Sequence, residues 1–195
     1  MKPLDKSYYQ APCLELAQQL LGCFLVHEIS DQKLVGRIVE TEAYRGSEDR
    51  AAHSYRNRRT KRTEVMFQEA GLVYTYQMHS HTLLNIVAGQ IGTPHAVLIR
   101  AIEPAGGIEQ MKRNRGETIK EIDLTNGPGK LTKALGITMN HYGHDISKKP
   151  LYIVKGTPIG DIATSPRVGV RNTGEAANYP WRFFEKNNPY VSKFR

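Results

Sequence analysis

The residues best placed to do chemistry lie in one segment, 34–44, where two glutamates and a tyrosine recur at every second position. Alternate residues of a β-strand point to the same face. A strand here therefore places Glu40, Glu42 and Tyr44 side by side, with Ile38 on the same face. A carboxylate held beside a reacting group can act as a general base. Glutamates are also common as plain surface residues, so this segment alone leaves both interpretations open.

Residues in other segments favour the chemical interpretation. His53 follows soon after the strand, and Tyr74 and Tyr76 share one face of a second expected strand. Arg100 stands within the apolar run 96–102. A buried arginine needs a partner, and a carboxylate is the natural one. Aromatic rings, a carboxylate and basic loops are what a protein needs to hold a base rotated out of a duplex.

The charge of the chain favours a polyanionic partner. Its 27 Lys and Arg residues exceed its 19 Asp and Glu residues, which gives a formal net charge of +8 and a pI of about 9.5. Such a balance promotes binding to polyanions, although some proteins are merely basic. The segment 45–62 is more informative, because seven of its residues are basic and two acidic: Arg45, Arg50, Arg56, Arg58, Arg59, Lys61 and Arg62, with Glu48 and Asp49. It predicts a solvated loop that could lie against phosphates.

The spacing of apolar residues predicts more strands than helices. We expect strands at 23–29, 34–44, 72–78, 83–87, 96–102, 151–154 and 168–170, and helices at 11–21, 107–115 and 130–135. In the run 96–102, alternation places Ala96, Leu98, Arg100 and Ile102 on one face. Most connections are too short for parallel crossovers. The sequence therefore predicts an α+β fold, a single compact domain over 1–195 with a curved, mainly antiparallel sheet and short surrounding helices.

Several short segments resemble, in the same order, the signature segments of the alkyladenine (3-methyladenine) DNA glycosylases, in particular the bacterial type. They are 36–44, 51–54, 74–76, 83–85, 97–104, 127–131, 166–170 and 180–183. Each is weak evidence alone, but together they run from about Leu14 to Ser192 and are highly specific. The resemblance implies a DNA repair enzyme that flips alkylated or deaminated purines out of double-stranded DNA and hydrolyses the N-glycosidic bond.

The resemblance also implies roles in the catalytic centre. Glu42 would deprotonate the attacking water, and its charge would steady an oxocarbenium-like sugar. Arg100 and the backbone carbonyl of Val168 would help to hold that water. No lysine in the matched segments takes a Schiff-base role. We therefore expect a monofunctional glycosylase that leaves an abasic site and uses neither a metal nor a cofactor.

The residues of the base pocket are implied by the same resemblance. The flipped base would stack between Tyr44 on one side and His53 and Tyr76 on the other. A backbone donor at His53 would read the 6-position of the purine. Asn85 would crowd the 2-amino group of normal guanine.

Further residues are expected to contact the DNA outside the pocket. Those expected on the phosphates are Arg58, Arg59, Lys61 and Lys130. The family usually places a tyrosine on a hairpin tip as the wedge that fills the gap left by the flipped base. Here the segment 77–82 is one residue shorter, with His79 at that position. Met78 and His79 are therefore expected to form the wedge, since apolar side chains can also unstack bases.

Two other classes of function stay open on the residues alone. A metal-dependent nuclease would hold Mg²⁺ through carboxylates, and its candidates are Glu40, Glu42, Glu48 and Asp49. A non-catalytic protein that recognises damaged duplex would need no base. His79 and His81 are interpreted as exposed loop histidines rather than as a metal site.

The cysteines and the hydropathy pattern predict the setting of the protein. Cys13 and Cys23 belong to no CxxC pair and to no zinc-like array. The first residues lack the apolar region of a signal peptide, and no apolar run approaches the ~20 residues of a membrane span. We expect a reduced, cytoplasmic, nucleoid-associated monomer with no membrane contact.

Overall fold

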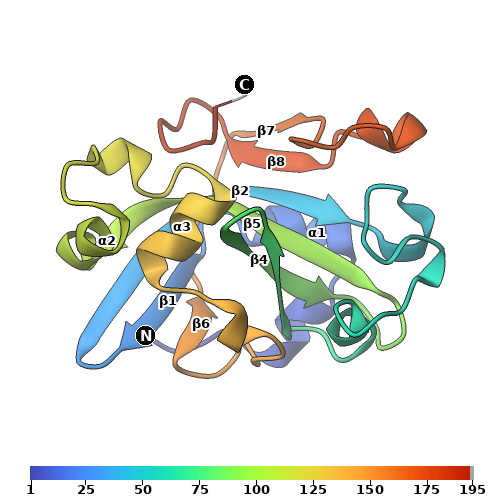
Figure 1. The fold of residues 1–195 in the computed structure, drawn as a ribbon, viewed down its shortest axis with the longest axis horizontal. Helices are drawn as coiled ribbons and strands as arrows, with labels where there is room; N and C mark the ends of the chain where they lie inside the picture. Colours follow the sequence, from blue (N-terminus) through green and yellow to red (C-terminus); the bar gives the residue numbers. More distant parts are fainter. Residues whose placement is uncertain (194–195) are drawn as a thin grey trace.

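An eight-stranded antiparallel sheet forms the body of the molecule in the computed structural model, which describes residues 1–193 (Figure 1). Its strands are β1 (Phe24–Ile29), β2 (Gln32–Tyr44), β3 (Val73–Met78), β4 (His81–Ala88), β5 (His95–Gly106), β6 (Leu151–Val154), β7 (Ile162–Ser165) and β8 (Arg182–Glu185). They follow the order β3-β4-β5-β2-β1-β6 across the sheet, and β8 pairs with β2 and β7. Together with the helices, this curved antiparallel sheet confirms the predicted α+β fold.

Strand β2 has different neighbours along its length. Its first half pairs with β1 through residues 32–37, and its second half pairs with β8 through residues 40–42. Strand β5 pairs with the other edge of β2 between Val35 and Tyr44. The segment that carries the two candidate glutamates is thus held on both edges by other strands.

An irregularity in β2 separates its glutamates from the apolar residues before them. Just after Ile38, the register between β2 and β5 shifts twice. A β-bulge of this kind disturbs the alternation of side chains. Ile38 belongs to the main core together with Ala43, so the prediction that it shares a face with Glu40 is wrong. Ile102 of β5 also belongs to this core, although alternation placed it on the face of Ala96, which packs in a different cluster.

Short helices accompany the sheet within the described residues. The α-helices are α1 (Cys13–Gln19), α2 (Ile108–Arg115) and α3 (Pro128–Leu135). Single 3₁₀ turns lie at Lys6–Gln10, Gly46–Glu48, Tyr55–Asn57, Glu64–Phe67, Glu121–Asp123, Met139–His141 and Gly174–Ala177. Helices α1 and α3 bury leucines in the main core, namely Leu16, Leu131 and Leu135. None of the helices within 1–193 is long and apolar enough to cross a membrane.

The structure also departs from the expected elements near the C-terminus. The strand expected at 168–170 is wrong, because these residues form a turn in which Gly169 has a φ of 75°. A positive φ is natural for glycine and interrupts an extended strand. Strands β7 and β8 were not predicted from the sequence. Each has four residues, too few to show a clear alternation.

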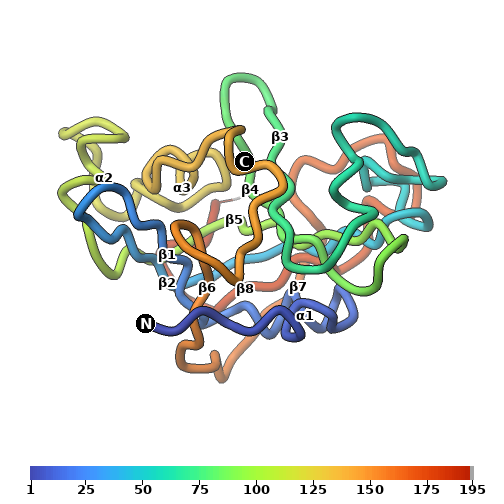
Figure 2. Tube along the Cα trace, turned by 90° about the horizontal axis from the view of Figure 1, so that it is seen from below, coloured from blue at the N-terminus to red at the C-terminus, as the bar shows by residue number. Residues whose placement is uncertain are grey.

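Three segments converge near the end of β2. The β3–β4 hairpin projects from the body, with α3 on one side and the loop after β2 on the other (Figures 1 and 2). The hairpin is tied to α3 because Thr132 Oγ1 donates to the Thr82 carbonyl at 2.6 Å. The loops after β2 and β7 are tied together by an ion pair between Asp49 and Arg167. This arrangement encloses the space in front of Tyr44.

Candidate active site

A cavity of about 530 Å³ lies between the hairpin and the loops that follow β2 and β7. Aromatic rings reach it from three segments: Tyr44 from β2, His53 from the loop after β2, and Tyr74 and Tyr76 from β3. The turn 168–171 also lines it. A hollow walled by aromatic rings suits a flat ligand such as a nucleobase.

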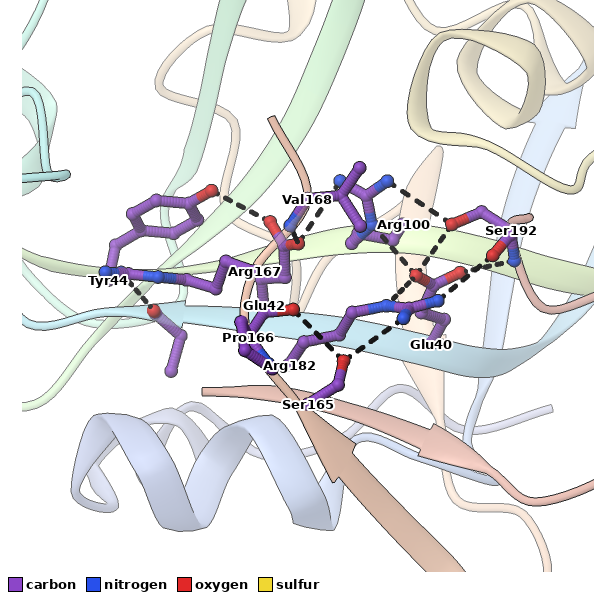
Figure 3. Close-up of polar contacts among 11 residues, drawn as sticks. Glu40, Glu42, Tyr44, Arg100, Ser165, Pro166, Arg167, Val168, Arg182 and Ser192 are labelled. Carbon is purple, nitrogen blue, oxygen red and sulfur yellow. Dashed lines mark hydrogen bonds and ion pairs between the residues drawn. The ribbon is translucent and has the colours of Figure 1, made fainter. Parts of the chain in front are cut away.

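The carboxylate of Glu42 lies fully buried behind two of these lining residues. Its Oε1 accepts a hydrogen bond from the Val168 backbone N–H at 2.7 Å, and its Oε2 accepts one from the Tyr44 hydroxyl at 2.8 Å (Figure 3). Arg100 Nη1 lies 3.4 Å from Oε1. Burial, followed by the charge of Glu42, raises the pKa of Tyr44 well above its usual range, so this hydroxyl stays protonated and donates. The arrangement orients a carboxylate at the wall of the cavity.

A second buried carboxylate, Glu40, organises a cluster of charges next to Glu42. Glu40 Oε1 accepts from Arg100 Nε at 2.9 Å and from Arg182 Nε at 2.6 Å. Burial acts to lower the pKa of Arg100, but the charges of Glu42 and Glu40 outweigh it and leave that pKa raised. Arg100 thus has the acidic partners that a buried arginine needs, and it stays charged beside Glu42.

His53 faces two tyrosines in the aromatic wall. Its ring packs edge-on against Tyr76, with centroids 4.6 Å apart, and its Nδ1 lies 2.7 Å from the Tyr74 hydroxyl. Burial lowers the pKa of His53 to about 4, and the nearby charges of Arg62 and Arg58 act in the same direction. The imidazole is therefore neutral at neutral pH, which suits a stacking surface better than an acid.

Tyr44 is supported from behind by a buried guanidinium. The Arg167 guanidinium carbon lies 4.6 Å from the centroid of the Tyr44 ring and 5.1 Å from that of Trp181. Arg167 is itself fixed by Asp49, whose Oδ1 accepts from Nη2 at 2.9 Å, and both side chains are fully buried. With one face covered in this way, the other face of Tyr44 is left for a ligand in the cavity.

Comparison with known proteins places these features in a family. The family described as methylpurine-DNA glycosylase matches residues 7–189. The chain is 58% identical over 192 residues to a protein of Bacillus subtilis (strain 168), with 98% of this chain and 97% of that protein covered. A protein of Listeria monocytogenes serovar 1/2a is 47% identical over 192 residues, covering 97% and 92%. The names of both assign them provisionally to 3-methyladenine DNA glycosylase.

The chain belongs to the methylpurine-DNA glycosylase family. It is therefore a DNA glycosylase of the repair type. In this glycosylase, the structure brings the residues predicted for catalysis and for the base pocket to one place. Tyr44, His53, Tyr76, Asn85 and Val168 line the cavity, and Glu42 and Arg100 lie directly behind its wall.

Two of these residues have contacts that the sequence did not suggest. Val168 was predicted to act through its carbonyl, but the contact it makes with Glu42 is through its N–H. Asn85, buried at the cavity, donates from Nδ2 to the carbonyl of its cross-strand neighbour Tyr74 at 3.0 Å. This bond fixes the amide plane, and with it the side chain that a purine in the cavity would meet.

The expected wedge residues line the cavity, and the expected phosphate contacts lie on the two segments that flank the β3–β4 hairpin (Figure 2). Met78 and His79 line the cavity at the hairpin tip, where Met78 is 46% exposed and His79 has a φ of 54°. Arg58 and Lys61 are exposed, whereas Arg59 is paired with Glu64 at 2.6 Å. The remaining predicted contact, Lys130, donates to Asn126 Oδ1 at 2.6 Å in the first turn of α3. The glycosylase thus presents basic side chains on both sides of the hairpin.

Sequence reasoning missed the residues that contact Glu40 and Tyr44 on the side away from the cavity. They are Arg167, Arg182 and Ser192, with Asp49 as a partner of Arg167 rather than a metal ligand. Arg167 and Arg182 fall within segments recognised as similar to the family, but their partners are far away in the chain. The only available signal was the presence of arginines beside aromatic or apolar residues, which indicates burial with an acidic partner.

Proposed function

We propose that this glycosylase receives a damaged purine, rotated out of double-stranded DNA, in the aromatic cavity and hydrolyses its N-glycosidic bond. Glu42 activates the attacking water, and the product is an abasic site. The observation that carries this proposal is the position of Glu42: a fully buried carboxylate, held by Arg100 and the Val168 N–H, directly behind an aromatic cavity.

The contacts of Glu42 leave room for one more donor. Oε1 faces the Val168 N–H and Arg100, whereas Oε2 accepts only from the Tyr44 hydroxyl among the contacts described. A carboxylate oxygen has two acceptor sites, so Oε2 retains one for a water molecule. Deprotonation of that water would produce the nucleophile. The negative charge of Glu42 would stabilise the positive charge that develops on the sugar as the bond breaks.

The cavity favours hydrolysis over covalent catalysis by an amine. A glycosylase that also cleaves the backbone would use an amine to form a Schiff base. Within the described residues, the cavity lining includes no lysine. We therefore infer a monofunctional enzyme in which water attacks the sugar.

The pocket suggests alkylated and deaminated purines as substrates. An alkylated, positively charged purine is already a good leaving group, so one carboxylate base is sufficient for its removal. Asn85 stands where it could exclude the 2-amino group of guanine, and the backbone at His53 could read the 6-position. Met78 and His79 would fill the space left in the duplex, and the basic side chains around the hairpin would contact phosphates. We infer that the enzyme acts as a monomer.

The nuclease alternative is disfavoured by the partners of its candidate ligands. Glu40 and Glu42 face Arg100, Glu48 faces Arg45, and Asp49 faces Arg167. Within residues 1–193, no three His, Cys, Asp or Glu side chains are grouped so that they could hold a metal ion. Carboxylates neutralised by arginines are poorly prepared to bind Mg²⁺.

The test measures excision and binding separately. Single-turnover release of free base from alkylated duplex DNA, followed by chromatography, is compared for the wild type and Glu42→Gln. We expect lesion binding to persist and excision to fall by at least about 10²–10⁴-fold, the usual contribution of a general base. A chelator should not affect the wild type. Near-normal excision by the variant would remove Glu42 from the mechanism, and strand cleavage abolished by the chelator would instead support a nuclease.

A further inference from the structure

The last described residues of the chain reach into the buried charge cluster behind Glu42. Ser192 is only 8% exposed, and its N–H and hydroxyl donate to the two oxygens of Glu40, each at 2.7 Å (Figure 3). The hydroxyl oxygen also accepts from Arg100 Nη2 at 3.3 Å. Arg182 Nη2 donates to the Ser192 carbonyl at 3.0 Å. One serine therefore contacts three of the four charged residues in the cluster.

These contacts determine the direction of the Arg100 guanidinium. Its Nε is held by Glu40 and its Nη2 by the Ser192 hydroxyl, which leaves Nη1 directed at Glu42 Oε1. A guanidinium is planar and rigid, so fixing two of its nitrogens also fixes the third. Glu40 in turn is balanced by Arg182, so the charge of Arg100 remains available to Glu42.

We propose that Ser192 is a positioning residue for catalysis, which acts through Arg100 on Glu42 and on the water that Glu42 activates. This inference rests on the function proposed above. The family match ends at residue 189, so Ser192 lies outside the matched residues. Without its hydroxyl, Arg100 Nη2 becomes a buried donor without its acceptor, which is unfavourable. The guanidinium then rotates toward other acceptors, and Nη1 leaves its position beside Glu42.

A serine outside the cluster, Ser165, provides a matched control, because its described side-chain contacts include neither Glu42 nor Arg100. Ser165 Oγ accepts from Arg182 Nη1 at 3.1 Å and donates to the neighbouring Pro166 carbonyl. Ser165→Ala therefore removes a hydroxyl from the Arg182 side of the cluster, whereas Ser192→Ala removes one that touches Glu40 and Arg100. Ser192→Thr retains the hydroxyl of the wild type.

The experiment measures single-turnover excision from alkylated duplex DNA over a range of pH, with lesion binding and thermal unfolding measured on the same proteins. We expect Ser192→Ala to bind the lesion normally but to excise it about 10-fold more slowly. A misplacement of 1 Å can cost about 100-fold, and the displacement here is smaller because Arg100 Nε remains bonded to Glu40. Its pH–rate profile should also differ from that of the wild type, because Arg100 Nη1 no longer lies beside the carboxylate of Glu42. Ser192→Thr and Ser165→Ala should keep the wild-type rate and profile.

Three results would overturn the proposal. The first is a wild-type rate and profile for Ser192→Ala. The second is an equal loss of rate in Ser165→Ala with no movement of either profile, which would show that the serines only stabilise the fold. The third is a folded Ser192→Thr that behaves like Ser192→Ala, and this comparison remains decisive even if Ser192→Ala unfolds. Failure of the proposed function would look different, because the wild type itself would then release no free base.

Discussion

Tyr44→Phe would remove a single oxygen atom from the candidate active site and keep the ring that faces the cavity. The lost hydroxyl is the donor to Glu42 Oε2 at 2.8 Å, while Val168 and Arg100 continue to contact Oε1. Because the pKa of Tyr44 is raised by burial, its hydroxyl is a donor over the whole working range of pH. The substitution therefore isolates one hydrogen bond to the proposed base.

The size of the effect follows from the charge of the acceptor. A hydrogen bond to a charged group contributes about 1.5–3 kcal/mol, and each 1.36 kcal/mol of lost transition-state stabilisation slows a reaction tenfold. Without this donor, Oε2 of Glu42 loses the bond that orients the carboxylate for the attacking water. We expect the single-turnover rate of excision to fall by about 10- to 150-fold, with lesion binding retained.

The assay follows single-turnover excision of one defined lesion from one duplex at one pH, so that the leaving group is the same for both proteins. Tyr142→Phe is the matched control, because its hydroxyl bonds the backbone of Lys61 and Val65 outside the catalytic centre. Its excision rate should equal that of the wild type. An unchanged or higher excision rate for Tyr44→Phe would refute the reasoning. A loss of lesion affinity equal to the loss of rate would also contradict it.

Two further predictions concern the DNA-binding surface. The first is a triple variant that neutralises Arg58, Arg59 and Lys61 in the loop after β2. It should flatten the slope of log affinity against log salt by about 1.8, because each phosphate contact contributes about 0.9 and Arg59 is already paired with Glu64. An unchanged slope would mean that the loop faces away from DNA. At the hairpin tip, His79→Tyr should raise excision of a stably paired lesion more than that of a mispaired one, and Met78→Ala should do the reverse, because unstacking costs least for mispaired bases. A fluorescent base analogue would report flipping directly, and no change in its emission with either variant would exclude the wedge.

Local sequence patterns predicted well the residues around Glu42. The two-residue period of a strand placed Glu40, Glu42 and Tyr44 on one face, and the structure has all three in one network with Arg100. The isolated arginine in an apolar run predicted an acidic partner. The bulge after Ile38 was not predictable, because it arises from the register between two strands and leaves no mark on the periodicity of either one alone.

The support behind the site could not be predicted for a different reason. Arg182 and Ser192 are separated from Glu40 by 142 and 152 positions in the chain. Periodicity describes neighbours along the sequence, and neither residue belongs to a run long enough to show it. The four residues of β8 pair with β2 at residues 40–42, beyond the residues 32–37 of β2 that pair with β1.

The pairing of β2 with β8, a strand much later in the chain, has a consequence for the synthesis of the enzyme. A ribosome delivers the strand with Glu40 and Glu42 long before it delivers β8, and domains generally fold as units during synthesis. Until β8 arrives, the edge of β2 exposes unpaired amides, and Glu40 lacks the guanidinium of Arg182. A chain interrupted before β8 therefore contains the aromatic residues of the cavity but lacks Arg182, which holds Glu40 in the candidate active site.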